Sequence, residues 1–344
     1  MRKIQQWLDN DRLEHLADFL NDLLEERRPS YATVRTFQDA LLATARSPGR
    51  DRIALVVDIT GRLRDTAPFP RPKPGIAAPE SWLRGGEAEV ALWLADNQRL
   101  ADLLPVLDTF TELAACLLHE LILRHGSLAN RPEAIRLAEH LHATGHPLAD
   151  LPLHRLEPEE SAFPFLGLPT ATHGLANEPV LHQSAGRPHA IESIEVEWPE
   201  AEQAKAVLLD YQITDPTLAE ARLYLLAKTV PLTPALLLSL NADCLAGAKT
   251  VQARQVSSAE LWTALFRKSV AGGPYTDRHS GAYSRARAWR SFNALYGAEP
   301  GGTALLFSAD SDWYLRVAPV LDLGVAVLRA DGQTLALLAA TDSD

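Results

Sequence analysis

Residues 322–341 read DLGVAVLRADGQTLALLAAT, and this stretch decides the fold of the C-terminal part of the chain. Two almost continuously apolar arms, 322–329 and 333–341, flank the dipeptide Asp331-Gly332. Asp-Gly tolerates positive φ at both central positions of a type I′ turn, so the stretch predicts a β-hairpin that turns at this dipeptide. An edge hairpin would alternate apolar and polar residues. We therefore expect both arms to be central strands that are covered on both faces.

The remaining C-terminal sequence indicates further strands and helices. Residues 303–307 are expected to form a third strand of the same sheet. Residues 191–198 alternate apolar side chains with acids, which is typical of a half-buried strand at a sheet edge. Ser257 and Glu260 have the spacing of a capping box at the start of a helix. These patterns predict a small, mostly antiparallel sheet covered by helices.

The N-terminal part is expected to be helical throughout. Residues 1–146 carry apolar residues at helical spacing, with Ser30 placed to cap one helix. Another helix is expected from Val106 to Arg124, and the last one is expected to have Asn130 as its cap and Pro132 in its first turn. No fixed repeat period is visible, which favours an irregular helical bundle or a short solenoid.

Residues 147–190 differ in composition from the sequence on either side. Seven prolines fall in this stretch and helical periodicity is lost, so we interpret it as an irregular connector rich in proline and histidine. The predicted fold class is α+β. The predicted organisation is a helical domain at 1–146, the connector at 147–190 and an α+β domain at 191–344.

The composition excludes several classes of protein. Acidic residues outnumber basic ones by 44 to 33, which gives a net charge of −11 over 344 residues. Such a surface repels phosphate groups, so we expect neither nucleic acid nor a membrane among the partners. Two distant cysteines, Cys116 and Cys244, cannot form a disulfide framework or a CxxC metal site. With no apolar signal-peptide core and no long apolar run, we expect a cytoplasmic protein, whose oligomeric state the sequence leaves open.

Two C-terminal stretches carry a family resemblance. Residues 271–275 read AGGPY and lead to GAYSR at 281–285, while DWY at 312–314 is followed by LDLG at 321–324. Together they resemble an uncharacterised bacterial family, mainly actinobacterial, that is classed as a domain of unknown function. The resemblance covers the C-terminal part only. It implies membership of a domain family and no activity, cofactor or site residue.

A candidate metal or acid–base site lies at one end of the predicted sheet. In a hairpin centred on Asp331-Gly332, Asp322 faces Thr341, and the antiparallel third strand would deliver further acids to the same end. Hard cations such as Mg²⁺ prefer carboxylate oxygens, and two carboxyl groups can also share acid–base work. The alternative, which we favour, is a solvated acidic end that binds no metal. This acidic rim comprises Asp310, Asp312, Asp322, Asp342 and Asp344.

A second candidate site is the loop at 272–281, which leads into a helix. Arg278 could bind a carboxylate or phosphate, and His279 could shuttle a proton near neutral pH. The alternative is an ordinary capped loop whose arginines pair with the acidic rim. The candidate ligand-binding residues are Tyr275, Arg278, Arg287 and Arg290.

The histidines do not indicate a zinc site. Nine of the 11 lie between His119 and His189, but the spacing of His119 and His125 differs from that of an HExxH motif. Cys116 shares a helical face with His119 and Glu120, and its apolar neighbours indicate a buried thiol.

Two hypotheses for function follow. The favoured one is a non-enzymatic protein-interaction module in which the helical part presents a groove to another protein, with no cofactor. The alternative is a hydrolase or a phosphoryl-transfer enzyme with its site between the 272–281 loop and the acidic rim. That enzyme would need Arg278, His279 and Asp322 to converge on one reacting centre.

Overall fold

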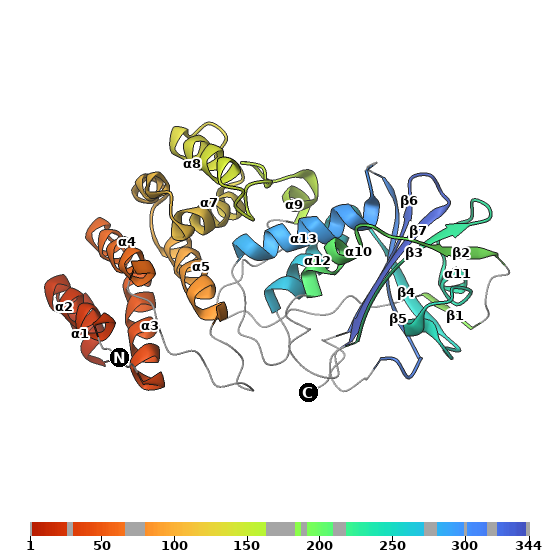
Figure 1. The fold of residues 1–344 in the computed structure, drawn as a ribbon, viewed down its shortest axis with the longest axis horizontal. Helices are drawn as coiled ribbons and strands as arrows, with labels where there is room; N and C mark the ends of the chain where they lie inside the picture. Colours follow the sequence, from red (N-terminus) through yellow and green to blue (C-terminus); the bar gives the residue numbers. More distant parts are fainter. Residues whose placement is uncertain are drawn as a thin grey trace. The chain divides into compact units, whose positions relative to one another are not determined.

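The computed structural model describes residues 2–25, 30–65, 80–162, 183–186, 191–208, 218–271, 281–298, 301–314 and 322–341. The chain divides into two compact units (Figure 1). Unit 1 contains Met1–Arg155 with His279–Tyr283, and unit 2 contains Leu156–Arg278 with Ser284–Asp344. Unit 1 is helical and unit 2 combines a sheet with helices, so the predicted α+β fold class is confirmed.

Unit 1 is built around helix α7. All of its residues from Leu113 to Leu123 are buried, as expected of a helix that is surrounded by others. Helix α5 packs against α7, and α3 packs against α5. The helices of this unit are α1 (Arg2–Asp9), α2 (Leu13–Leu24), α3 (Tyr31–Arg46), α4 (Arg50–Asp65), α5 (Glu80–Asn97), α6 (Leu100–Leu103), the 3-10 helix η1 (Leu104–Thr109), α7 (Glu112–His125) and α8 (Pro132–Ala143).

The helix starts of unit 1 confirm one predicted cap, Ser30, and correct another, Asn130. The Ser30 hydroxyl accepts the backbone N–H of Thr33 at 3.1 Å, so it caps α3 as predicted. Asn130 does not cap α8. The N–H of Arg131 donates to the carbonyl of Leu128, and this turn makes Arg131 the residue that precedes the helix.

The helix predicted from Val106 to Arg124 is interrupted. Phe110 adopts left-handed backbone angles (φ 51°, ψ 36°) between η1 and α7. Local side-chain bonds compete with a continuous helix here, because the Thr109 hydroxyl donates to the Val106 carbonyl at 2.7 Å. The Thr111 hydroxyl then accepts the N–H of Ala114 at 3.2 Å and starts α7.

Unit 2 contains a seven-stranded sheet in the order β1-β4-β5-β6-β7-β3-β2, and every neighbouring pair is antiparallel. Helices α12 and α13 lie on one side of the sheet and α11 on the other (Figure 1). The strands are β1 (Gln183–Ala185), β2 (Ser193–Val196), β3 (Leu218–Leu226), β4 (Val251–Val256), β5 (Gly302–Ala309), β6 (Leu323–Arg329) and β7 (Thr334–Thr341). The helices are α9 (Glu157–Ala162), α10 (Ala201–Ala204), η2 (Lys205–Leu208), α11 (Pro234–Leu237), η4 (Asp243–Leu245), α12 (Ser258–Ala271) and α13 (Gly281–Tyr296), whose first three residues belong to unit 1.

The hairpin of β6 and β7 is central, as predicted. Its register runs from Leu323 opposite Ala340 to Leu328 opposite Leu335, so it is centred on Asp331-Gly332. The turn type is different from the predicted I′, because of these two residues only Gly332 has a positive φ (68°). The Asp331 carboxylate instead closes the loop by accepting the backbone N–H groups of Gln333 and Thr334 at 2.9 and 2.8 Å.

The structure tests three further predictions for unit 2. β5 pairs with β6 as the predicted third strand. The capping box is present, since Glu260 accepts the N–H of Ser257 at 2.8 Å and the Ser257 hydroxyl accepts the N–H of Glu260 at 3.2 Å. β2 is an edge strand as predicted, but it is not half-buried. Ile194 is 68% exposed, while α10 and η2 pack on the neighbouring strand β3.

The short helix α9 lies within the stretch that the sequence indicates as a connector. It buries Glu159, whose carboxylate forms an ion pair with Arg285 of α13, and both side chains are fully buried. None of the helices in the described part of the chain is long and apolar enough to cross a membrane.

Candidate functional site

Two residues of the acidic rim, Asp322 and Asp310, accept hydrogen bonds from nearby parts of the chain. Asp322 accepts the hydroxyl of Thr341 at 2.7 Å, across the hairpin as expected. Asp310 accepts the N–H groups of Lys249 and Thr250 at 2.7 and 2.8 Å, and these bonds lower its pKa. Asp312 is exposed, while Asp342 and Asp344 lie outside the described residues. Among the residues that the structure describes, no group of three or more His, Cys, Asp or Glu side chains could hold a metal ion.

The 272–281 loop lies outside the described residues except for Gly281. Tyr275, Arg278 and His279 are therefore not placed, and their convergence with Asp322 stays a prediction. Arg287 and Arg290 lie on α13, where Arg287 is partly buried and Arg290 is exposed.

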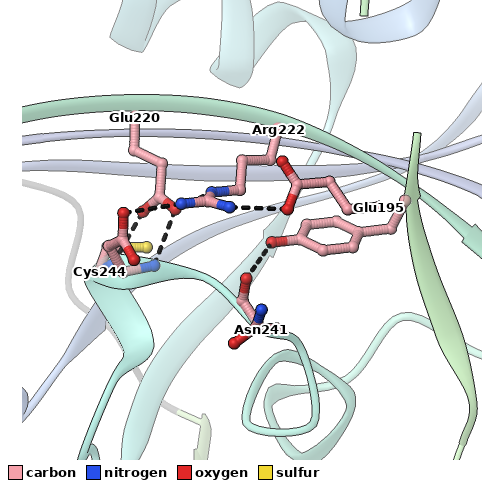
Figure 2. A network of polar contacts seen from close by, with 7 residues as sticks. Glu195, Glu220, Arg222, Asn241 and Cys244 are labelled. Carbon is pink, nitrogen blue, oxygen red and sulfur yellow. Dashed lines mark hydrogen bonds and ion pairs between the residues drawn. The ribbon is translucent and has the colours of Figure 1, made fainter. Parts of the chain in front are cut away.

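A polar cluster that the sequence did not indicate lies beside β3 in unit 2. We call it the Arg222 network. Its members are Glu195 of β2, Glu220 and Arg222 of β3, and Asp243 and Cys244 of η4, and Figure 2 labels all of them except Asp243. The Arg222 guanidinium binds three carboxylates. Its Nη1 donates to Glu195 at 2.7 Å, its Nη2 donates to Asp243 at 2.7 Å, and its Nε donates to Glu220.

Glu220 anchors the η4 loop to the sheet. This side chain is buried, and its two carboxylate oxygens accept the backbone N–H groups of Asp243 and Cys244, each at 2.8 Å (Figure 2). The Ser311 hydroxyl donates to the carbonyl of Cys244 at 2.6 Å. The carboxylate thus satisfies the free amides at the start of a 3-10 turn, which is a structural task.

The reactive atoms near this network are held in their protonated forms. Burial raises the pKa of the Cys244 thiol, and the Glu220 carboxylate raises it further. Burial also raises the pKa of Tyr224 and of Tyr314. A thiol or phenol with a raised pKa is a poor nucleophile and a poor base at neutral pH, so this arrangement favours structural support over catalysis.

A second polar cluster lies in unit 1 around Glu112, in the first turn of α7. Glu112 Oε1 accepts the Tyr283 hydroxyl at 2.6 Å and the Cys116 thiol at 3.3 Å, and Oε2 lies 3.0 Å from His146 Nε2. The N–H of Leu148 donates to His146 Nδ1 at 3.2 Å, so Nε2 carries the proton and donates to Glu112. Both ring nitrogens are engaged within the protein, which leaves neither for a substrate.

The comparisons with known proteins place the whole chain in one family. A sequence model described as a family of unknown function, DUF6183, matches residues 1–344. The chain belongs to the DUF6183 family. The sequence indicated the family only from its C-terminal part, and the match shows that the helical part belongs to it as well. The search of curated proteins and the search of solved structures each found no match.

The polar residues that organise this DUF6183 protein were missed at the level of sequence for a physical reason. Glu112 and Tyr283 are 171 positions apart, and nothing in the spacing of either residue points to the other. A local signal existed only for Glu220 and Arg222. They lie two positions apart within the otherwise apolar strand LAEARLYLL, so both side chains point to the same face.

The Glu112 cluster predicts a pH-dependent contribution to stability. Burial raises the pKa of Glu112, but the hydrogen bonds from His146, Tyr283 and Cys116 outweigh burial and hold the pKa at about 2, below its ordinary 4.5. A lowered folded-state pKa stabilises the fold above about pH 4.5, and this stabilisation is lost as the pH falls towards 2. The difference in unfolding free energy between the parent and Glu112→Gln is therefore expected to shrink across this window.

Urea denaturation at a series of pH values, followed by tryptophan fluorescence, measures that difference. Tyr283→Phe serves as a second variant, because it keeps the carboxylate and removes one of the hydrogen bonds that lower its pKa. The pKa of Glu112 in the folded variant then lies closer to 4.5, so the loss of stability on acidification should be smaller and should end at a higher pH than in the parent. A parent–variant difference for Glu112→Gln that stays constant through the window would contradict the assignment.

Proposed function

We propose that this protein is a non-enzymatic protein-interaction module that binds an extended segment of a partner protein along the edge strand β2. The observation that carries the proposal is the combination of a free strand edge with exposed apolar side chains. Among the strands that the structure describes, β2 is the last of its sheet and pairs with β3 alone. Ile194, Val196 and Leu225 are 68%, 36% and 46% exposed.

The backbone of β2 supports strand addition. The N–H of Ala227 donates to the carbonyl of Glu192 at 3.0 Å, which makes these two residues a hydrogen-bonded pair. Because such pairs alternate along an antiparallel ladder, Ile194 and Val196 also turn their N–H and C=O groups towards β3. Ser193 and Glu195 turn theirs outward, where an extended segment can bond to them.

The side chains of the same edge support a protein partner. Ile194 lies directly opposite Leu225 in the register, so their exposed apolar side chains share one face of the sheet. An added strand would place its own side chains beside them and remove this apolar surface from water. The polar clusters around Glu112 and Arg222 are occupied with internal bonds, which favours binding over catalysis. The groove predicted on the helical part stays a prediction.

Replacing Ser193 by proline tests the proposal. Proline removes the outward N–H of an edge strand without removing a bond to β3, whereas Ser193→Ala keeps that N–H and serves as the matched control. Peptides of about ten residues, the length of a long strand, are selected from a random displayed library on the full chain. The selected peptides are then synthesised, and their binding is measured by fluorescence anisotropy.

The selected peptides are expected to bind Ser193→Pro about tenfold more weakly than Ser193→Ala. Circular dichroism of both variants checks that the fold is retained. A library that yields no binder, or peptides that bind both variants equally, would show that β2 is not a docking edge.

A further inference from the structure

We infer that the segment received by β2 is one in which apolar residues alternate with lysine or arginine. This inference rests on the proposed function and adds the chemistry of the partner. Two observations support it: the negative charge along the edge of β2, and the alternation of apolar and acidic side chains along this strand.

The edge of β2 is acidic. Glu195 lies within the strand, Glu192 and Glu197 flank it, and all three side chains are exposed. Glu200 follows and is exposed as well. Within the described part of the chain, Glu192, Glu197 and Glu200 form no ion pair.

An ion pair at this edge does not neutralise it. Arg222 binds Glu195, but its guanidinium also binds Glu220 and Asp243 (Figure 2). One positive charge thus faces three carboxylates. The local charge is therefore negative on the same side of β2 to which Glu195 points, and a basic partner side chain would offset it.

The apolar and acidic side chains of β2 point to opposite faces. Ile194 and Val196 share one face with Leu225, while Glu195 lies on the other, because side chains alternate along a strand. A neighbouring strand alternates with the same period. A segment that places apolar residues beside Ile194 and Val196 must therefore place its intervening residues beside Glu195, where lysine or arginine is favoured.

A second copy of this chain fits the edge poorly. Pairing of two β2 strands would bring three exposed carboxylates, Glu192, Glu195 and Glu197, from each copy to one short ladder. A register centred on Glu195 would place the two Glu195 side chains directly opposite each other, and like charges in that position destabilise a sheet. The charge of the edge therefore selects a basic partner.

Three synthetic peptides test the inference on the full chain. They share the same valines, which alternate with lysine in the first peptide, serine in the second and glutamate in the third. Binding is measured by fluorescence anisotropy at low and high salt. The lysine peptide is expected to bind about tenfold more tightly than the glutamate peptide and to weaken as salt rises.

A charge-reversal variant locates the effect. Glu197→Lys is expected to weaken the lysine peptide about tenfold and to reverse the order of the lysine and glutamate peptides. Glu139→Lys is the matched control, because it makes the same change of charge at an exposed position on α8 in unit 1 and should leave the order unchanged.

The outcomes separate the two proposals. If all three peptides bind equally and all lose affinity in Ser193→Pro, the charge rule is overturned while docking at β2 holds. If none binds although library peptides do bind at β2, the basic pattern is likewise overturned. Concentration-dependent self-association in sedimentation analysis, lost in Ser193→Pro, would instead identify a second copy as the occupant. If no segment of any kind binds at β2, both proposals fail.

Discussion

Replacing Glu159 by alanine is expected to lower the free energy of unfolding by about 3–5 kcal/mol. Glu159 and Arg285 are both fully buried, and they are joined by Nε–Oε1 and Nη2–Oε2 bonds of 2.5 and 2.9 Å. The same carboxylate accepts Trp289 Nε1 at 2.9 Å and the N–H of Leu156 at 2.7 Å. Removing it takes away the carboxylate that binds the buried guanidinium of Arg285, and breaking a buried pair in this way costs more than the pair itself contributes.

Chemical denaturation of the variant, followed by tryptophan fluorescence, measures this loss. Glu157→Ala is the control, because Glu157 is an exposed acid on the same helix and its loss is expected to change stability by no more than about 0.5 kcal/mol. Substituting Glu159 and Arg285 together by leucine and methionine should recover part of the loss, since both charges of this pair are then absent from the interior. Equal unfolding midpoints for Glu159→Ala and Glu157→Ala would contradict the role assigned to the pair.

Replacing Glu220 by alanine is expected to cost about 2–4 kcal/mol. This side chain is 6% exposed, accepts the backbone N–H groups of Asp243 and Cys244 and also binds Arg222. Its removal leaves two backbone donors in the η4 turn without their acceptor. Glu220→Gln should lie between the parent and Glu220→Ala, because one amide oxygen still accepts while the NH₂ group opposes the other donor.

Hydrogen exchange gives this prediction a local readout. The amides of Asp243 and Cys244 are expected to exchange faster in Glu220→Ala, while the amides of the central strands β6 and β7 keep their relative order of protection. Glu195→Ala is the matched control, because it removes another carboxylate from Arg222 at an exposed position. Unchanged protection at Asp243 and Cys244 would refute the anchoring role of Glu220.

For the central hairpin, the local sequence predicted the register correctly but not the turn type. The Asp331-Gly332 turn between two apolar arms was enough to predict the register, because the position of a tight turn fixes which residues of the two strands lie opposite each other. The turn type was wrong because the Asp331 side chain bonds to the backbone of Gln333 and Thr334, and φ therefore stays negative at this residue. The type I′ prediction rested on the backbone preference of Asp-Gly and did not consider the hydrogen bonds of the Asp331 side chain.

The edge strand shows where local pattern misleads. The alternation in residues 191–198 predicted a strand at an edge, and β2 occupies that place. The same alternation predicted that its apolar side would be half-buried, yet Ile194 is 68% exposed. Period-two alternation reports that one face is apolar. Whether anything covers that face depends on how far the helices of the opposite layer extend.

For polar contacts as well, the sequence predicted those between residues in local patterns and missed those between distant residues. Spacing within a short stretch identified the Ser30 cap, the Ser257–Glu260 capping box and the contact of Asp322 with Thr341. The buried pair of Glu159 and Arg285 joins residues 126 positions apart, and the sequence around either residue does not indicate its partner.

The amino-acid sequence by itself determined the α+β class, the central hairpin and its register, since these follow from the period of apolar residues and from turn chemistry within a few positions. Only the tertiary structure decided which carboxylates are buried beside arginines and which apolar strand face stays open to water. Those outcomes depend on which distant segments pack together, and the free energy of a buried charge or an exposed isoleucine is set by those neighbours.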